Sequence, residues 1–469
     1  MSRIGDVTGG AAQPAHRSDP DLMSARPNIL YVMTDQQAAR AMSCSANPYI
    51  TTPGMDRIAA VGVRFELAYA TQPLCLPNRT CMFTGRLPHE TGATINNPPK
   101  PNRVDDDPHL GRLLADAGYD CGYFGKWHIG SSSEDPARHG FREIWTSGAE
   151  PIDHEPTVTA RCLDFVRQAR ETPFFAVASY INPHNICQWA RGGDRLLTEL
   201  PNCRITPVPA PEGCPPLPEN FAIPDDEPER LRWVHDHGLA ADRLYPTATW
   251  SEGLWRQYLW AYYRITESVD RCIMRLLDGL ETAGFLEHTL ILFTSDHGEG
   301  CAEHHWNQKQ TLYESVTHVP FIITDPSARK AGRVERQTLV SNGLDLMPTV
   351  CDYAGISPPD GCRGVSLRPV VTNHGAPTGR DFIVLETTFA QSAEELGLRG
   401  RCLRTGRHKY IVYDRGRRRE QLFDMNNDPG EMSNLAARRE HQHILGRHRE
   451  LLAGWCRDTE DPFPLIRAG

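Results

Sequence analysis

The chain has 469 residues, of which 39% are hydrophobic and 23% charged, and its formal net charge is −9. This length can bury a large core and predicts one large domain with a smaller one. The negative charge argues against a nucleic-acid partner. No apolar run approaches the roughly 20 residues that span a bilayer, so we expect no membrane segment.

The amino-terminal residues 1–25 are polar and rich in Gly, Ala, Ser and Asp, without the apolar stretch of a secretory signal. We expect a disordered leader there, with Met23 as an alternative start. The 14 cysteines form no Cys-x-x-Cys pair, so we interpret most of them as buried reduced thiols and expect a cytoplasmic protein. Cys203 and Cys214 are the first candidates for a disulfide if that interpretation is wrong.

A short apolar run at residues 28–34 has the pattern of a strand that is buried on both faces of a parallel sheet. Asp35 and Gln36 follow it. Ligands of open α/β sheets bind at the carboxyl ends of strands, so these side chains are candidate ligands. An aspartate in this position can also cap a following helix. Residues 55–61 are expected to form the next helix.

The stretch Cys75-Leu-Pro77-Asn-Arg79 carries the first sign of chemistry. Proline is favoured at the first position of a helix, so we expect a helix from Pro77 toward Thr84 with Cys75 at its mouth. Backbone N–H groups and the helix dipole favour an anion there, and the Arg79 fork can point back at it. The arrangement suits a nucleophile that attacks a tetrahedral oxyanion. A thiolate is one candidate, although the longer glycine-bearing loop of cysteine phosphatases is absent.

Two further strands are predicted to end in basic side chains. Residues 119–124 lead into Lys126 and His128, which are two positions apart and can reach one ligand. Residues 174–181 end shortly before His184. Each of these groups can also be an ordinary surface or packing residue.

Residues 250–284 show a long helical periodicity with one apolar face, which indicates a core helix. The buried run at residues 289–295 follows and ends in Asp296 and His297. Two buried strands that end in Asp-Gln and Asp-His repeat one geometry at distant places. Four oxygen or nitrogen donors presented in this way could enclose one hard divalent cation.

Lys309 lies in the next loop, ahead of a strand at residues 319–324 and an amphipathic helix at residues 341–355. His304 and His305 either reach the pocket or cap this loop. From about residue 370 the pattern changes to short strands joined by polar turns, which indicates an antiparallel sheet. A helix at residues 435–456 is expected to close the chain.

In their order along the chain, these motifs resemble the type I sulfatases of the alkaline phosphatase superfamily from Asn28 to about Leu435. The resemblance implies an α/β fold with a large mixed sheet between helices, which we assign to residues 26–370. It also implies a smaller carboxyl-terminal subdomain, residues 371–469, with an antiparallel sheet and one helix.

In that family a maturation enzyme oxidises the cysteine that matches Cys75 to formylglycine, and the hydrated aldehyde is the nucleophile. The resemblance implies that position 75 lies beside one Ca²⁺ or Mg²⁺. The matching metal ligands are Asp35, Gln36, Asp296 and His297.

The resemblance also implies roles for the basic residues. Lys126 and Lys309 would hold the sulfate oxygens, and Arg79 would hold the diol and the helix mouth. His184 or Lys309 would protonate the leaving alcohol. His128 would deprotonate the second hydroxyl, which expels sulfate and restores the aldehyde.

Three positions depart from the commoner family pattern. Asn78 stands where many members have serine, Gln36 where many have aspartate, and His297 where many have asparagine. The Asp-Gln and Asp-His set also resembles phosphonate monoester and phosphodiester hydrolases of the same superfamily, which share the formylglycine.

We therefore predict hydrolysis of a small sulfated sugar, aryl or alkyl ester, with phosphonate or phosphodiester hydrolysis as the alternative. A non-catalytic relative that binds a sulfated ligand is a third hypothesis. The sequence does not fix the substrate or the oligomeric state.

Overall fold

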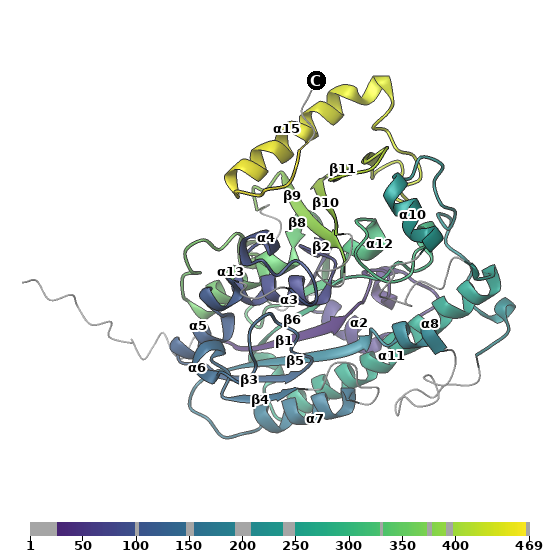
Figure 1. Cartoon of the computed structure of the whole chain (residues 1–469). Helices are drawn as coiled ribbons and strands as arrows, with labels where there is room; N and C mark the ends of the chain where they lie inside the picture. Colours follow the sequence, from purple (N-terminus) through teal and green to yellow (C-terminus); the bar gives the residue numbers. More distant parts are fainter. Residues whose placement is uncertain are drawn as a thin grey trace, which may run out of the picture.

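The computed structural model describes residues 26–98, 103–146, 154–192, 208–237, 249–328, 332–372, 378–390 and 397–465. The expected leader and Cys203 lie outside these ranges. Two sheets organise the described residues, a large one in the body of the molecule and a small one above it (Figure 1). The predicted fold class, a mixed α/β sheet with a separate antiparallel sheet, is confirmed.

The large sheet has eight strands in the order β4-β3-β5-β1-β6-β7-β2-β8. β1 pairs in parallel with β5 and β6, whereas β7 runs antiparallel to both of its neighbours. The strands are β1 Asn28–Asp35, β2 Val63–Tyr69, β3 Asp120–Gly125, β4 Glu143–Thr146, β5 Phe174–Pro183, β6 Thr289–Ser295, β7 Phe321–Thr324 and β8 Arg333–Ser341.

β1 lies in the middle of this sheet because both of its faces are apolar. Successive side chains of a strand point to opposite faces. Tyr31 and Met33 accordingly enter one hydrophobic core, and Leu30 and Val32 enter the other. The strand therefore separates two cores, and its polar carboxyl end is held at the edge between them.

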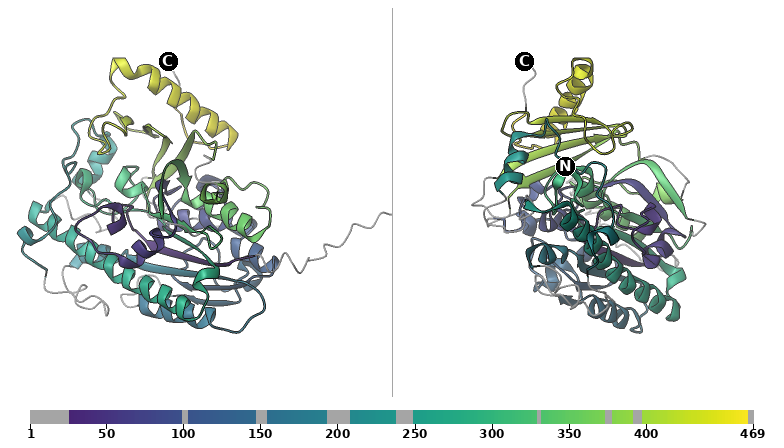
Figure 2. Two further views of the ribbon diagram at one scale, coloured as in Figure 1. Left: turned by 180° about the vertical axis from the view of Figure 1, so that it is seen from behind. Right: turned by 90° about the vertical axis from the view of Figure 1, so that its right-hand side faces the viewer.

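Helices cover both faces of the large sheet. α7 and α11 lie on one face, and α3, α5 and α13 lie on the other (Figures 1 and 2). The helices are α2 Pro53–Ala59, α3 Cys75–Thr84, α4 Pro88–Thr91, α5 Leu110–Asp116, α6 Pro136–His139, α7 Glu155–Val166, α8 Ile186–Gly192, α10 Glu229–His237, α11 Glu252–Thr282, α12 Glu314–Thr317, α13 Asn342–Ala354, α14 Arg368–Thr372 and α15 Gln442–Asp458.

The cysteine helix α3 begins two residues before the predicted start. Cys75 is its first residue, and the Asn78 N–H donates to the Leu74 carbonyl at 3.1 Å. Pro77 therefore lies within the first turn, where its missing N–H leaves no intrahelical bond unmade. Cys75 still lies at the amino-terminal end of the helix, as expected.

The small sheet contains β9 Phe382–Phe389, β10 Leu398–Thr405, β11 His408–Tyr413 and β12 Glu420–Asp424, all antiparallel. The closing helix α15 packs on it but begins at Gln442, later than the predicted start at residue 435. Leu435 N instead donates to the Leu422 carbonyl at 2.8 Å, so this segment pairs with the edge of β12.

Strand β9 joins the small sheet to the body of the molecule. Glu386 N donates to the Thr71 carbonyl at 2.8 Å, and Thr387 Oγ1 donates to the Gln310 carbonyl at 2.7 Å. Thr71 precedes the cysteine helix, and Gln310 follows Lys309. The small sheet therefore contacts two of the segments that carry predicted catalytic residues, those of Cys75 and Lys309.

Within the described ranges, no helix is both long and apolar enough to cross a membrane. The thirteen cysteines that the structure describes, Cys214 among them, are free thiols.

Candidate active site and metal centre

The ends of two central strands bring distant acidic residues together. Asp35 ends β1, and Asp296 follows β6, which is the next strand in the sheet. Gln36 N donates to Asp296 Oδ1 at 3.1 Å, and Asp296 N donates to the Thr34 carbonyl at 3.2 Å. Both carboxylates are fully buried.

Four candidate donor groups face one another at this edge. The ligand atoms of Asp35, Cys75, Asp296 and His297 all lie within 4.8 Å of one another. His297 Nε2 lies 3.1 Å from Cys75 Sγ, 3.7 Å from Asp296 Oδ1 and 3.9 Å from Asp35 Oδ1. Carboxylate oxygens with one imidazole suit a hard divalent cation, so this donor set fits the predicted metal.

Arg79 points at the two carboxylates. Its Nε donates to Asp296 Oδ2 at 2.7 Å, and one terminal nitrogen donates to Asp35 Oδ2 at 3.1 Å. The other terminal nitrogen donates to the Lys126 carbonyl and to Ser179 Oγ, both at 2.9 Å. This buried fork fixes the two acids relative to helix α3.

Two lysines supply positive charge around position 75. Lys309 Nζ lies 3.1 Å from Cys75 Sγ, and Lys126 Nζ donates to Asp35 Oδ2 at 2.5 Å. Burial and the Asp35 carboxylate act to raise the pKa of the Cys75 thiol, but Lys126, Lys309 and His297 outweigh them and hold it well below its usual value. The surroundings therefore favour an anionic group at this position.

Gln36 and His184 are the remaining predicted site residues near Lys309. Gln36 Oε1 lies 3.3 Å from Lys309 Nζ. Burial, together with the charges of Lys309 and Lys126, holds the pKa of His184 well below its usual value, so its imidazole is neutral. Among the described residues, His184 Nδ1 has no hydrogen-bond partner.

Three predicted histidines, His128, His304 and His305, form no hydrogen bond or ion pair with the cluster of Asp35, Cys75, Asp296 and His297 among the described residues. Within the described ranges, no hydrogen bond or ion pair links His128 to the donor cluster, and its backbone φ is +42°. His304 is buried and stacks on Tyr313 at 4.1 Å, and His305 packs on Phe221 at 4.2 Å. Both therefore form part of the packed wall beside α11 and α12.

Asn78 has a structural role that the sequence reading did not assign. Its Nδ2 donates to the Asp296 carbonyl at 2.5 Å and to Asn342 Oδ1 at 3.0 Å, and its Oδ1 accepts from Thr71 N at 3.0 Å. The amide therefore joins helix α3 to the end of β6 and to the start of α13. A serine hydroxyl could not make these three bonds at once.

Glu299 is a buried residue of this site to which the sequence analysis assigned no function. It accepts a hydrogen bond from Gln36 Nε2 at 2.6 Å. Its position two residues after His297 was the only signal in the sequence, because its partners are far away along the chain.

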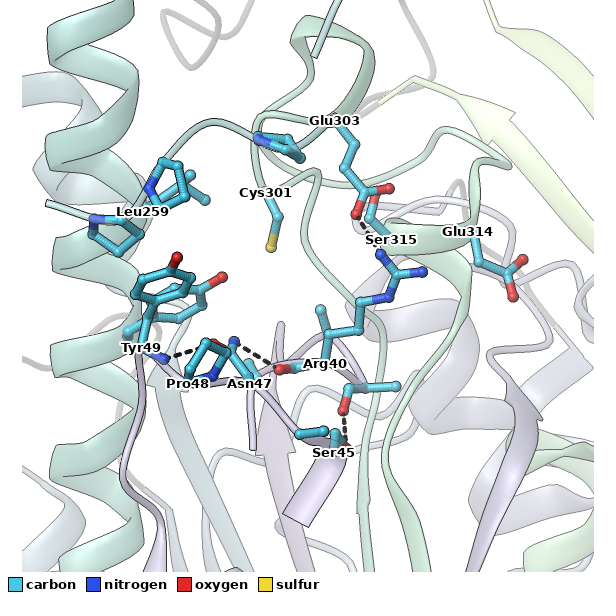
Figure 3. Close-up of a pocket in the computed structure, with 18 of the residues that line it drawn as sticks. Arg40, Ser45, Asn47, Pro48, Tyr49, Leu259, Cys301, Glu303, Glu314 and Ser315 are labelled. Carbon is cyan, nitrogen blue, oxygen red and sulfur yellow. Dashed lines mark hydrogen bonds and ion pairs between the residues drawn. The ribbon is translucent and has the colours of Figure 1, made fainter. Parts of the chain in front are cut away.

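A separate cavity of about 340 Å³ is lined in part by the loop that follows His297. Arg40, Tyr49, Cys301 and Glu303 line it, and Arg40 forms an ion pair with Glu303 at 3.5 Å on one side of it (Figure 3). None of the residues predicted to bind the cation or the sulfate lines this cavity, so it is distinct from the catalytic centre.

The fold and this site indicate an α/β enzyme that holds Cys75 at a helix amino terminus beside a candidate metal-binding group. Residues 27–356 match the sulfatase family, and residues 302–456 match the family described as N-sulphoglucosamine sulphohydrolase, C-terminal. The chain belongs to the sulfatase family and is a sulfuric ester hydrolase. The predicted family is confirmed.

Two similar proteins come from Bacteroides thetaiotaomicron. A Delta 4,5-hexuronate-2-O-sulfatase is 29% identical over 452 residues, covering 94% of this chain and 91% of the relative. An N-acetylglucosamine-6-O-sulfatase is 29% identical over 498 residues, covering 94% of this chain and 88% of the relative.

Solved structures show the same fold. A 2-O GAG sulfatase superimposes with a TM-score of 0.80 at 28% identity, covering 93% of each chain. A structure in complex with its substrate D-glucosamine-2-N,6-O-disulfate has a TM-score of 0.77 at 26% identity, covering 94% of this chain and 100% of the other. The phosphonate monoester hydrolase of Agrobacterium radiobacter has a TM-score of 0.72 at 22% identity, covering 91% of this chain and 95% of the other, and is similar in fold alone.

Proposed function

We propose that this sulfatase removes sulfate from a small sulfated sugar, with formylglycine at position 75 and one divalent cation. The observation that carries the proposal is the convergence of Asp35, Cys75, Asp296 and His297 within 4.8 Å, with Lys309 3.1 Å from Cys75. In this structure Cys75 is a thiol, and its sulfur stands in for the oxygens of a formylglycine hydrate.

We assign the cation to Asp35, Gln36, Asp296 and His297, with position 75 beside them. Two carboxylates, an amide oxygen and one imidazole fit Ca²⁺ or Mg²⁺. When bound, the cation would lower the pKa of the hydrate and polarise a sulfate oxygen.

The chain's own residues orient the reaction. Lys309 and Lys126 hold the sulfate oxygens, where their ammonium groups stabilise the charge that develops on them. Arg79 holds both acidic ligands and the mouth of helix α3, and thereby fixes the position of residue 75 relative to them.

His184 is our candidate for the proton donor to the leaving oxygen. Its imidazole is neutral beside Lys309 and Lys126. A bound sulfate ester adds a negative charge that opposes this effect and favours protonation. We keep His128 as the candidate base for the second hydroxyl, which requires its side chain to turn toward position 75.

The family relatives support a sugar substrate, since two of them are named for sulfated hexuronate and N-acetylglucosamine. Maturation by a formylglycine-generating enzyme is part of the proposal. We also propose residues 26–370 as the catalytic domain and residues 371–469 as the carboxyl-terminal subdomain, joined through β9.

Two measurements test the proposal. Mass spectrometry of the Cys75 peptide from the native host should show an aldehyde in place of the thiol group. Sulfate release from hexuronate 2-sulfate, N-acetylglucosamine 6-sulfate and nitrophenyl sulfate should then be compared with phenol release from a phenyl phosphonate ester. An unmodified thiol would remove the formylglycine mechanism. Failure on both sugars with turnover of nitrophenyl sulfate would remove the sugar assignment.

A further inference from the structure

Glu299 lies at the centre of a buried hydrogen-bond network beside the catalytic group. One oxygen accepts from Gln36 Nε2 at 2.6 Å. The other accepts from Tyr258 Oη and from the Gln308 backbone N–H, both at 2.6 Å. Every one of these neighbours donates, so Glu299 acts as an acceptor at both of its oxygens.

The orientation of the Gln36 amide follows from what lies at its two ends. The nitrogen faces the Glu299 carboxylate, and the oxygen faces the Lys309 ammonium at 3.3 Å. Turning the amide over would place its oxygen against the carboxylate and its NH₂ against the ammonium. Cys187 Sγ lies 3.4 Å from the nitrogen and 3.5 Å from the oxygen and so favours neither orientation.

The backbone of Gln36 is held on both sides. Its φ is +69°, its N–H donates to Asp296 at 3.1 Å, and its carbonyl accepts from Tyr262 Oη at 2.8 Å. The main chain is therefore fixed at both groups, and the contacts of the amide decide which way its oxygen faces.

We propose that Glu299 is a positioning residue that holds the Gln36 amide with its oxygen toward the catalytic centre. The inference rests on the proposed role of Gln36 as a cation ligand. Only the oxygen of an amide binds a hard cation, so an overturned amide would present a donor where a ligand is needed. Tyr258, from helix α11, anchors Glu299 in turn.

The variant Glu299→Gln separates this role from simple packing. The NH₂ of its new amide must face one of the groups that donate to Glu299. If the NH₂ faces Gln36, only the hydrogen bond from Gln36 is lost. If it faces Tyr258 and Gln308, the hydrogen bond from the Gln308 N–H is lost and the contact with Tyr258 is perturbed. The variant therefore turns its NH₂ to Gln36 and forces the Gln36 amide to turn over.

The exchange of the two groups should reverse the defect. In Gln36→Glu alone, two carboxylates would meet where the amide and Glu299 now lie 2.6 Å apart. In the double variant Gln36→Glu/Glu299→Gln, the new amide donates to the new carboxylate, whose other oxygen faces the cation site. A residue that acted only in packing would show no such rescue.

The experiment is isothermal titration of the full-length protein with Ca²⁺ and, separately, with Mg²⁺. Loss of a partner that orients a metal ligand lowers metal affinity by about 10–100-fold, and we expect this for Glu299→Gln. The double variant should return close to the wild-type affinity. Glu303→Gln is the matched control, because Glu303 is a buried carboxylate of the same loop that faces Arg40 and not Gln36 (Figure 3).

Three results would overturn the inference. Glu299→Gln could bind Ca²⁺ as tightly as the wild type, or Glu303→Gln could lose as much affinity. If Glu299→Gln does not fold, the comparison is between the double variant and Gln36→Glu, and equal affinities would count against the proposal. Absence of Ca²⁺ and Mg²⁺ binding by the wild type would overturn the cation site itself, which distinguishes that failure from failure of the Glu299 role.

Discussion

Replacing Arg79 by leucine should destabilise the protein by about 3 kcal/mol. Breaking a buried ion pair by removing one partner costs about 3–5 kcal/mol, because a charge is left buried without compensation. Asp35 would keep Lys126 at 2.5 Å, whereas Asp296 Oδ2 would lose the guanidinium at 2.7 Å. The Lys126 carbonyl would still accept from Tyr123 Oη at 2.6 Å. Most of the cost therefore falls on Asp296, which places the expected value at the lower end.

The assay is urea unfolding followed by tryptophan fluorescence, for which the chain carries nine tryptophans. Arg79→Lys is the companion variant, since it keeps the charge and loses the planar fork, and it should recover part of the loss. A change below about 1 kcal/mol for Arg79→Leu would refute the reasoning, because such a value is typical of exposed pairs. It would mean that Asp296 is not held by this ion pair.

Three further predictions follow from the site and its supports. Lys309→Ala should lower kcat for sulfate release by about 10²–10³-fold with the fold retained, since removal of a group that stabilises developing charge has this effect. Lys309→Arg keeps the charge and should lose less of the kcat. A kcat near the wild-type value for Lys309→Ala would contradict the role of Lys309 in holding the sulfate. Burial acts to lower the pKa of His89, but its bond to Glu386 at 2.6 Å outweighs this and raises it to about 8. The pairing should therefore stabilise the fold by about 1–2 kcal/mol below the unfolded pKa of about 6.5, and this stabilisation should be lost as the pH rises through 8. The difference in unfolding free energy between wild type and His89→Gln should accordingly shrink from about pH 6 to about pH 9. Equal differences at the two pH values would exclude the pairing. EDTA should lower the Tm, and Ca²⁺ at 100 times its Kd should raise the free energy of unfolding by about 2.7 kcal/mol. A Tm that responds to neither Ca²⁺ nor Mg²⁺ would argue against the cation site.

The central strands and the acids at their ends could be predicted because local pattern alone determines them. Residues 28–34 and 289–295 are continuous apolar runs, and each ends abruptly in an acid. Such runs are typical of strands that are buried on both faces of a parallel sheet. Proximity of Asp35 to Asp296 then follows from the shared edge of adjacent strands.

Other features depend on partners that no local pattern reveals. Glu299 meets Gln36 across 263 positions and Tyr258 across 41. The late start of α15 depends on Leu435 bonding to β12, which overrides the helical pattern before Gln442. Arg79 was expected at the helix mouth, but the acids that capture its fork come from two other strands. In each case tertiary hydrogen bonding decided the outcome.

The central place of β1 in its sheet has a consequence for biosynthesis. Gln36, which follows β1, and Asp296, which follows β6, are 260 residues apart. During synthesis β1 therefore lacks one of its neighbours until β6 leaves the ribosome. At about 5–20 residues per second, this interval lasts roughly 10 to 50 s. Cys75 is buried in the finished fold, yet until β6 is made its segment has no completed site around it. The maturation that we propose for Cys75 would therefore have a period in which the enzyme meets an extended chain at position 75.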